Sequence, residues 1–245
     1  MGYRSCKGIV IKEVNTGEAD RIITILTDEY GKISASAKNA RRTKNPLAAG
    51  TQLLCYSEFM MFKGKELHNI SSCEVIESFY EIRNDIVKLT YCSHILELVN
   101  DNIVENDPSS EILQLVLNTL FIIAHKDRAL ELIIRIFELR LMCLLGYEPQ
   151  VVYCMQCEKG IDSEAYFDFD NSSIVCKNCA KRANTMHISE ATAKALKYIV
   201  YVNPQKLFSF NLAEDSVRQL SELSKRYIKV HLGKTYNKLD YLKNL

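Results

Sequence analysis

Apolar and polar residues alternate along the first third of the chain. Apolar residues recur at every second position at Ile9 and Ile11, at Ile23 and Ile25, and from Ile33 to Ala37. This is the period of a strand with one buried face. Two similar stretches cover residues 54–62 and 67–76, and turn-forming residues separate all five stretches. Because closure removes the edges of a small sheet, we predict a five-stranded barrel over residues 1–80.

After Tyr80 the apolar period becomes helical. Apolar residues at three- and four-residue spacings predict five helices, at residues 82–105, 112–124, 129–145, 189–202 and 214–232. Ser109 offers a capping group to the second of these helices, and Gly146 can adopt the left-handed conformation that ends the third. The sequence therefore predicts an α+β protein whose second domain, residues 81–245, is mostly helical.

Two Cys-x2-Cys pairs lie eighteen residues apart, at Cys154 and Cys157 and at Cys176 and Cys179. This spacing is typical of a four-cysteine zinc site. Two short strands joined by a turn at residues 170–172 complete a zinc ribbon at about residues 150–182. Four thiolates fill the tetrahedral coordination of Zn²⁺, so we expect one structural zinc ion. Unligated core cysteines and an iron–sulfur cluster are the alternatives, although the compact spacing of ferredoxins is missing.

Composition and charge narrow the class of protein. Of the 245 residues, 47% are hydrophobic and 25% are charged, the balance of a globular chain with a core. The sequence contains neither an apolar run long enough for a membrane span nor a secretory signal. We therefore expect a cytoplasmic protein that does not contact a membrane. The known nucleotide-binding and catalytic motifs are missing, so we expect no catalytic residues and no enzyme.

The net charge of +1 hides an uneven distribution, because residues 1–50 carry 9 basic and 5 acidic groups. Lys38, Arg41, Arg42 and Lys44 follow the third predicted strand without an acid among them. Such a loop on a small barrel can bind successive phosphates of a nucleic acid, although a solvated loop would have the same composition. Stacking surfaces for bases could come from Tyr56, Phe59 and Phe62, of which alternation makes at least half core residues.

Several short motifs, taken in order, resemble the RecO recombination-mediator family of bacteria. They are Lys7–Ile11, Gly17–Arg21, Thr27–Lys32, Lys38–Arg42, Phe137–Arg140, Leu144–Pro149, the four cysteines and Tyr227–Gly233. The resemblance implies an N-terminal OB-fold, a helical domain with a zinc ribbon in many members, and binding and annealing of single-stranded DNA. It further implies work with RecR to load RecA onto strands coated by single-stranded-DNA-binding protein, and hence association with the nucleoid.

The resemblance also extends the DNA-binding prediction. Arg21 and Lys32 lie in matching motifs, and we expect them to support the four loop cations in binding single- and double-stranded DNA. The family usually has glycine at Asn39 and serine at Asn45. Asparagine tolerates a left-handed backbone, so these departures affect the geometry of the loop and not its charge.

Two arginines of the third predicted helix are candidate partner contacts. Glu131, Arg135 and Glu138 form a narrow polar stripe, while Arg140 points to the opposite, apolar side and must find an anion. That anion is either an internal carboxylate or, as the family resemblance implies, the acidic tail of single-stranded-DNA-binding protein. We therefore name Arg135 and Arg140 as candidates for binding that tail.

A different class of function fits the same features. A zinc-ribbon protein can act as an adaptor between other proteins in transcription or translation, with the barrel as a second adaptor surface. Annealing of complementary strands separates the two hypotheses, because an adaptor has no reason to accelerate pairing.

Overall fold

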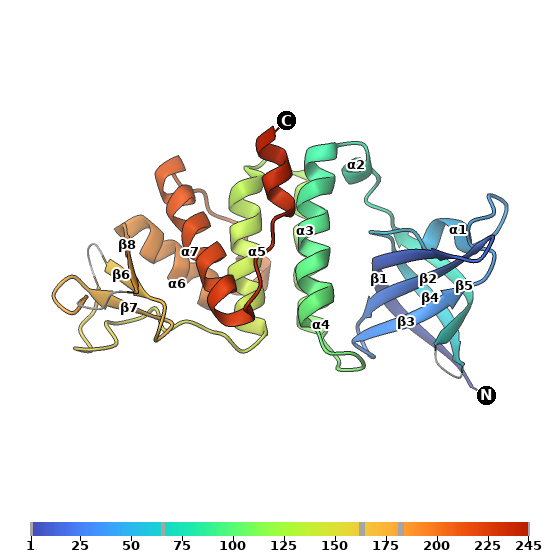
Figure 1. Ribbon diagram of the computed structural model, residues 1–245, viewed down its shortest axis with the longest axis horizontal. Coiled ribbons are helices and arrows are strands. Elements are labelled where there is room, and N and C mark those ends of the chain that lie inside the picture. The colour runs from blue at the N-terminus through green and yellow to red at the C-terminus, as the bar shows by residue number, and fades with distance from the viewer. Residues whose placement is uncertain (1, 65–66, 162–164, 181–183, 245) are drawn as a thin grey trace. The chain divides into compact units, whose positions relative to one another are not determined.

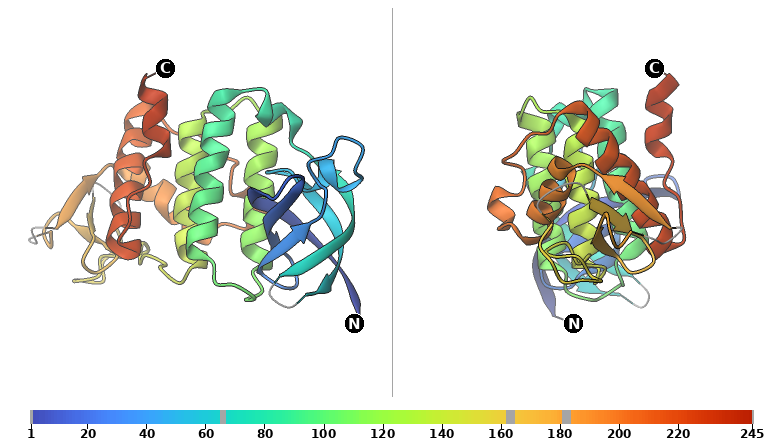
Figure 2. Two further views of the ribbon diagram at one scale, coloured as in Figure 1. Left: turned by 45° about the vertical axis from the view of Figure 1, so that its right-hand side comes forward. Right: turned by 90° about the vertical axis from the view of Figure 1, so that its left-hand side faces the viewer.

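The computed structural model describes residues 2–64, 67–161, 165–180 and 184–244. The chain divides into two compact units (Figures 1 and 2). The first comprises Met1–Lys126 together with Lys238–Leu245, and the second comprises Asp127–Asn237. The predicted division into residues 1–80 and 81–245 stays a prediction, and the compact units group the helices up to His125 with the strands that precede them.

Five strands close into a barrel in the first unit, which confirms the prediction. They are β1 (Tyr3–Thr16), β2 (Asp20–Thr27), β3 (Lys32–Ala37), β4 (Tyr56–Lys63) and β5 (His68–Glu77), in the spatial order β1-β2-β3-β5-β4. Strands β3 and β5 pair in parallel and the other neighbours are antiparallel. The short helix α1 (Leu47–Gly50) connects β3 to β4.

The barrel interior follows from the period of two. Along β3 the burial alternates so that Ile33, Ala35 and Ala37 are buried. On β2 and β4, Ile23 and Phe59 face the same core and are completely buried. Removing this apolar surface from water stabilises the barrel. Because side chains alternate along a strand, the intervening residues lie on the outside.

Three helices and the C-terminal segment complete the first unit: α2 (Tyr80–Arg83), α3 (Ile86–Asn102), α4 (Ser110–His125) and the 3-10 helix η2 (Lys238–Asn244). The sequence predicts one helix from residue 82, but the chain breaks and starts again at Asp85. Its carboxylate accepts the amides of Val87 and Lys88 at 2.9 and 3.1 Å, a helix-starting cap. The predicted cap Ser109 instead donates its hydroxyl to the carbonyl of Asp107.

The second unit combines helices with a small sheet. The helices are α5 (Leu130–Leu144), α6 (Glu190–Tyr201), η1 (Pro204–Lys206) and α7 (Glu214–Leu232), and α5 packs against both α6 and α7. The strands β6 (Ala165–Asp168), β7 (Ser173–Cys176) and β8 (Thr185–Ile188) form a sheet in the order β7-β6-β8. Gly146 follows α5 with a φ of +89°, as predicted. Within the described ranges, no helix is both long and apolar enough to cross a membrane.

Candidate nucleic-acid interface and metal centre

The basic loop after β3 has a fixed backbone and exposed cationic side chains. Asn39 adopts a φ of +55°, and its amide donates to the Asp20 carboxylate at 2.7 Å. The amide of Arg41 donates to the carbonyl of Ala19 at 2.9 Å. These bonds hold the loop against the turn between β1 and β2. The left-handed conformation expected of Asn39 is therefore present.

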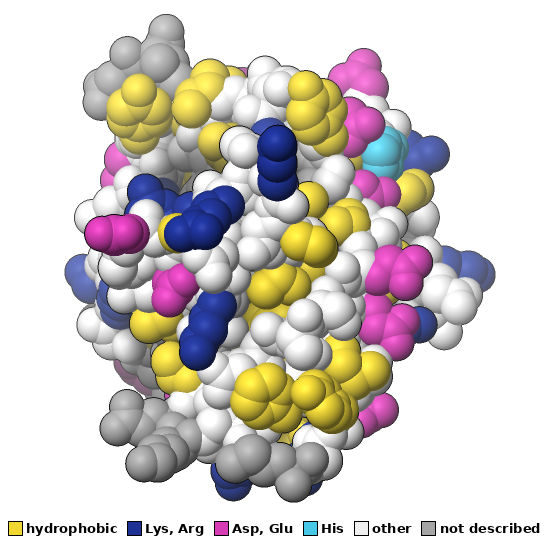
Figure 3. Space-filling view, turned by 90° about the vertical axis from the view of Figure 1, so that its right-hand side faces the viewer, with side chains coloured by type: hydrophobic (Ala, Val, Ile, Leu, Met, Phe, Trp, Pro, Cys, Tyr) yellow, Lys and Arg dark blue, Asp and Glu magenta, His cyan; other side chains and the backbone are white. Residues whose placement is uncertain are grey.

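The four loop cations Lys38, Arg41, Arg42 and Lys44 are all exposed. Arg41 donates to the carbonyl of Glu18 at 3.2 Å. None of the four forms an ion pair with any residue that the structure describes. The space-filling view that faces the barrel shows dark blue basic side chains gathered toward one side (Figure 3). A polyanion can therefore approach these charges without displacing a carboxylate of the described residues.

The two predicted supporting cations lie differently. The side chain of Arg21 is 12% exposed and donates to the Thr51 hydroxyl at 3.2 Å, with the Glu13 carboxylate 3.9 Å away. The half-buried ammonium of Lys32 donates to the carbonyl of Asn100 at 2.6 Å, at the end of α3. Both cations join parts of the first unit to each other, and their contact with DNA stays a prediction.

The four cysteines come together in the second unit. Their sulfur atoms all lie within 4.8 Å of one another, and those of Cys157 and Cys176 are 3.9 Å apart. Ligand sulfurs around one tetrahedral zinc ion lie roughly 3.7 Å apart, given Zn–S bonds of about 2.3 Å. The donor set and its spacing therefore fit a metal ion held by four thiolates.

The backbone prepares these sulfurs for a cation. Burial raises the pKa of the Cys154 thiol, but amides such as that of Cys176 donate to its sulfur and lower its pKa overall to about 6. The pKa of Cys179 rises to about 12, first because it shares a hydrogen bond with Cys176. Cys154 therefore forms a thiolate readily, whereas a second thiolate at Cys179 is disfavoured by the sulfurs around it. A cation bound among the four sulfurs would favour the thiolate form of each.

Arg135 lies in the interior of the second unit and not on a polar surface stripe. Its side chain and that of Glu138 are each 1% exposed, and Arg135 Nη1 lies 2.6 Å from Glu138 Oε2. Glu131 accepts from Arg135 Nε at 3.0 Å. Burial disfavours the guanidinium charge, but these carboxylates outweigh it and raise the pKa of Arg135. Ser221 and Ser224 of α7 donate to Glu131 and Glu138, which ties α5 to α7.

Among the residues that the structure describes, Arg140 finds carbonyl oxygens and not a carboxylate. Its Nη1 donates to the carbonyl of Ile199 at 3.2 Å and to that of Val200, both in the last turn of α6. The last carbonyls of a helix lack partners within the helix and carry partial negative charge. Sequence periodicity could not identify this acceptor, because α6 lies far along the chain.

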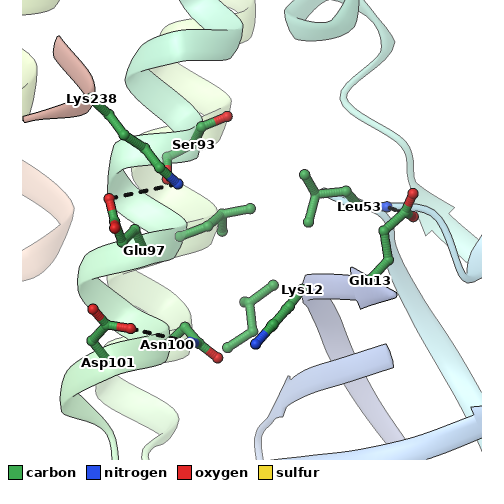
Figure 4. A pocket seen from close by; sticks show the side chains of 10 residues that line it. Lys12, Glu13, Leu53, Ser93, Glu97, Asn100, Asp101 and Lys238 are labelled. Carbon is green, nitrogen blue, oxygen red and sulfur yellow. Dashed lines mark hydrogen bonds and ion pairs between the residues drawn. The ribbon is translucent and has the colours of Figure 1, made fainter. Parts of the chain in front are cut away.

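A pocket of about 330 Å³ lies between β1 and α3 in the first unit (Figure 4). Lys238 of the C-terminal segment points across α3 toward Glu97, with 3.6 Å between the ammonium and the carboxylate. Glu13 accepts the amide of Leu53 at 2.9 Å on the barrel side. The lining combines two lysines with three acids, so it presents no strong field of one sign. Sequence analysis gave no signal for this pocket.

These features define a class: an α+β protein with a closed N-terminal barrel and a four-cysteine cluster that can hold a metal ion. The family model described as Recombination protein O N terminal matches residues 1–79, and the model described as Recombination protein O C terminal matches residues 83–240. The chain belongs to the RecO family of DNA repair proteins.

Relatives from several bacteria agree with this assignment. The DNA repair protein RecO of Acetivibrio thermocellus is 50% identical over 246 residues, which covers 100% of this chain and 98% of the relative. The protein of the same name from Caldicellulosiruptor saccharolyticus is 38% identical, with 99% of each chain covered. That of Clostridium acetobutylicum is 30% identical over 99% of this chain and 98% of its own.

Proposed function

We propose that this protein is a recombination mediator that binds single- and double-stranded DNA and anneals complementary strands. The observation that carries the proposal is the loop of Lys38, Arg41, Arg42 and Lys44, in which a hydrogen-bonded backbone presents exposed cations. Cations that contact phosphates release counterions from the nucleic acid, and this favours binding without regard to base sequence.

Annealing follows from the same electrostatics. Two complementary strands repel each other through their phosphates, and a protein that neutralises part of this charge lowers the cost of bringing them together. The bases then supply the specificity by pairing. No covalent bond changes in this process, so the protein acts without a catalytic residue and is not an enzyme.

Membership of the RecO family supports the proposed partners. We propose that the protein works with RecR to load RecA onto strands coated by single-stranded-DNA-binding protein, in association with the nucleoid. Arg140, which is half-buried, is the candidate contact for the acidic tail of the coating protein. Arg135 can reach that tail only if α5 and α7 separate, because it is buried between their side chains.

We further propose that the four cysteines hold one structural zinc ion. When bound, the ion would cross-link the loop that carries Cys154 and Cys157 to the end of β7 at Cys176 and the turn at Cys179. Four thiolates leave no coordination position for water or substrate, so the role is to stabilise the fold. We expect Cys176→Ser to lower the zinc content, measured by metal analysis, and the melting temperature. An unchanged melting curve would contradict this role.

Annealing of labelled complementary oligonucleotides tests the DNA function. We expect the wild type to accelerate pairing and the double variant Arg41→Ala with Arg42→Ala to lose most of that effect. The variant's single-strand affinity should also depend less on salt, with a slope shallower by roughly 1.4, two contacts at about 0.7 each. A wild type that does not accelerate pairing would instead favour the adaptor hypothesis.

The matched control removes two exposed cations elsewhere. Lys194→Ala with Arg218→Ala changes the net charge by the same amount, but each of these cations already pairs with a carboxylate of its own helix. Annealing by this control should equal that of the wild type. If the control loses as much activity as the loop variant, net charge and not the loop carries the function.

A further inference from the structure

We infer that the outside of the barrel carries a second subsite, built on Tyr3 and Phe62, that stacks the unpaired bases of single-stranded DNA. The inference rests on the proposed function and deepens it. The protein would distinguish single strands from duplexes at this subsite and not at the basic loop. The basic loop recognises phosphates, which both forms of DNA possess, whereas an aromatic surface recognises base faces, which only unpaired strands expose.

The aromatic pair lies on the outer surface of two neighbouring strands. Tyr3 of β1 is directly opposite Phe62 of β4, with ring centroids 5.7 Å apart and ring planes at 72°. Tyr3 is 66% exposed. Alternation along β4 turns Phe59 and Met61 into the core and leaves Met60 and Phe62 outside. Of the three aromatic residues that the sequence suggested for stacking, only Phe59 is a core residue, and not at least half of them as predicted. Tyr56 and Phe62 are half-buried and remain candidates.

A single row of paired residues joins this aromatic pair to the basic loop. Phe62 is opposite Asn69 of β5, and Asn69 is opposite Ser36 of β3. Lys38, the first cation of the loop, follows Ser36 by two residues. Three strand spacings of about 4.8 Å separate Tyr3 from Ser36. One such barrel binds roughly 4–16 nucleotides, and a strand of that length is long enough to cover this distance.

The row between the aromatic pair and the basic loop carries no charge, because Ser36 and Asn69 are neutral, so nothing in it repels the phosphates of a strand. Arg4 and Lys63 are exposed, but alternation places them on the opposite face of their strands from Tyr3 and Phe62. Glu58 and Glu74 lie opposite each other farther along β4 and β5. On the barrel side of the molecule, hydrophobic side chains cross the middle of the view, basic side chains lie on both sides of them, and most of the acidic ones lie on one side (Figure 3).

A tryptophan reporter tests the stacking directly. The chain contains no tryptophan, so Phe62→Trp creates a single fluorescent ring at the subsite. We expect oligothymidylate to quench this fluorescence as it binds, whereas a duplex of equal length binds, as anisotropy detects, with little quenching. Tyr80→Trp is the control, because Tyr80 is 65% exposed, like Tyr3, but lies outside the barrel face. Binding of oligothymidylate to the Phe62→Trp variant without quenching would overturn the proposal.

A second variant separates the subsite from the loop. We expect Tyr3→Ala with Phe62→Leu to weaken oligothymidylate binding by roughly 5- to 150-fold, the range for one base stacked on an aromatic ring. Duplex affinity and the salt slope should stay at wild-type values, which also shows that the variant is folded. Tyr3→Phe keeps the ring and should bind like the wild type.

The outcomes distinguish the two proposals. If the aromatic variant binds single strands like the wild type while the Arg41 and Arg42 variant binds poorly, the subsite is rejected and the DNA function stands. If neither variant changes binding, the proposed function fails as well. A loss of duplex affinity in the aromatic variant would also count against a subsite for unpaired bases.

Discussion

The basic loop of the barrel and helix α5 both carry arginines, but the arginines of the loop are exposed whereas those of α5 are buried or half-buried. Arg41 and Arg42 are exposed and pair with no carboxylate that the structure describes, while their loop is held by backbone hydrogen bonds. Arg135 is 1% exposed between two carboxylates, and Arg140 donates to the carbonyls that end α6. A cation buried between internal carboxylates, as Arg135 is, is therefore not available to a partner, whereas one that is bonded only to carbonyl oxygens still lacks an anionic partner.

The difference also separates binding from stability. A buried charge depends on its partner, because the interior does not solvate it and an unpaired charge there is costly. An exposed charge is solvated whether or not it binds anything. Substitutions in α5 should therefore change the free energy of unfolding, and substitutions in the loop should change DNA affinity.

The largest effect should come from breaking the buried pair. We expect Arg135→Ala to lower the free energy of unfolding by about 3–5 kcal/mol, because it leaves Glu138 buried without its cation. Urea unfolding measures this change. Arg41→Ala is the control and should stay within about 0.5 kcal/mol of the wild type. Equal stability of the two variants would remove the distinction between buried and exposed arginines.

Lys32 is half-buried, so its exposure is intermediate between that of the buried Arg135 and that of the exposed loop cations. We expect Lys32→Ala to lower the free energy of unfolding by about 1.5–3 kcal/mol, because its ammonium donates to the carbonyl of Asn100 at 2.6 Å. Lys38→Ala, six residues along the chain, should have almost no effect on unfolding. If Lys32→Ala instead weakens DNA binding and leaves stability unchanged, Lys32 belongs to the interface, as the sequence suggested.

Local patterns predicted most of the fold. The five strands, α7 and the turn at Gly146 depend on periodicity or on one residue's conformational freedom, which a few neighbouring residues determine. The cysteine cluster could be predicted because ligand spacing reflects the geometry of the ion. The sequence did not reveal the break at Asp85, because the apolar period continues across it. Nothing in that period shows that Asp85 caps a new helix instead of lying inside one.

The remaining features depend on contacts between distant segments. The sequence placed Arg135 on a polar stripe, but α7 covers that stripe with Ser221 and Ser224. Strand β8 has only four residues and becomes recognisable through its pairing with β6. The return of the C-terminal segment to α3 left no periodic signal. In each case the partner lies far away along the chain.

Asn39 tests whether the geometry of the loop matters as well as its charge. Its φ of +55° lies in the left-handed region, where a residue with a Cβ atom costs about 1–2 kcal/mol relative to glycine. Asparagine tolerates this region better than alanine, so we expect Asn39→Ala to lower the free energy of unfolding by about 1 kcal/mol. Asn39→Gly should keep both stability and DNA affinity. A loss of affinity in Asn39→Gly would mean that the amide side chain itself contacts DNA.

The smallest effect should come from the ion pair of the C-terminal segment with α3. The Lys238 side chain is 46% exposed and that of Glu97 is 26% exposed, with 3.6 Å between their charges. Water and salt screen such a pair, so we expect Lys238→Ala to lower the free energy of unfolding by about 0.2–1 kcal/mol. The loss of stability in Lys238→Ala should shrink in 1 M salt, where the screening length falls to about 3 Å.

The loss of stability in Lys32→Ala should persist in 1 M salt, because its half-buried hydrogen bond to a neutral carbonyl is less exposed to screening. If salt removed both losses equally, the half-buried lysine would be as solvated as the exposed one, and burial would not account for the different behaviour of the cations in this chain.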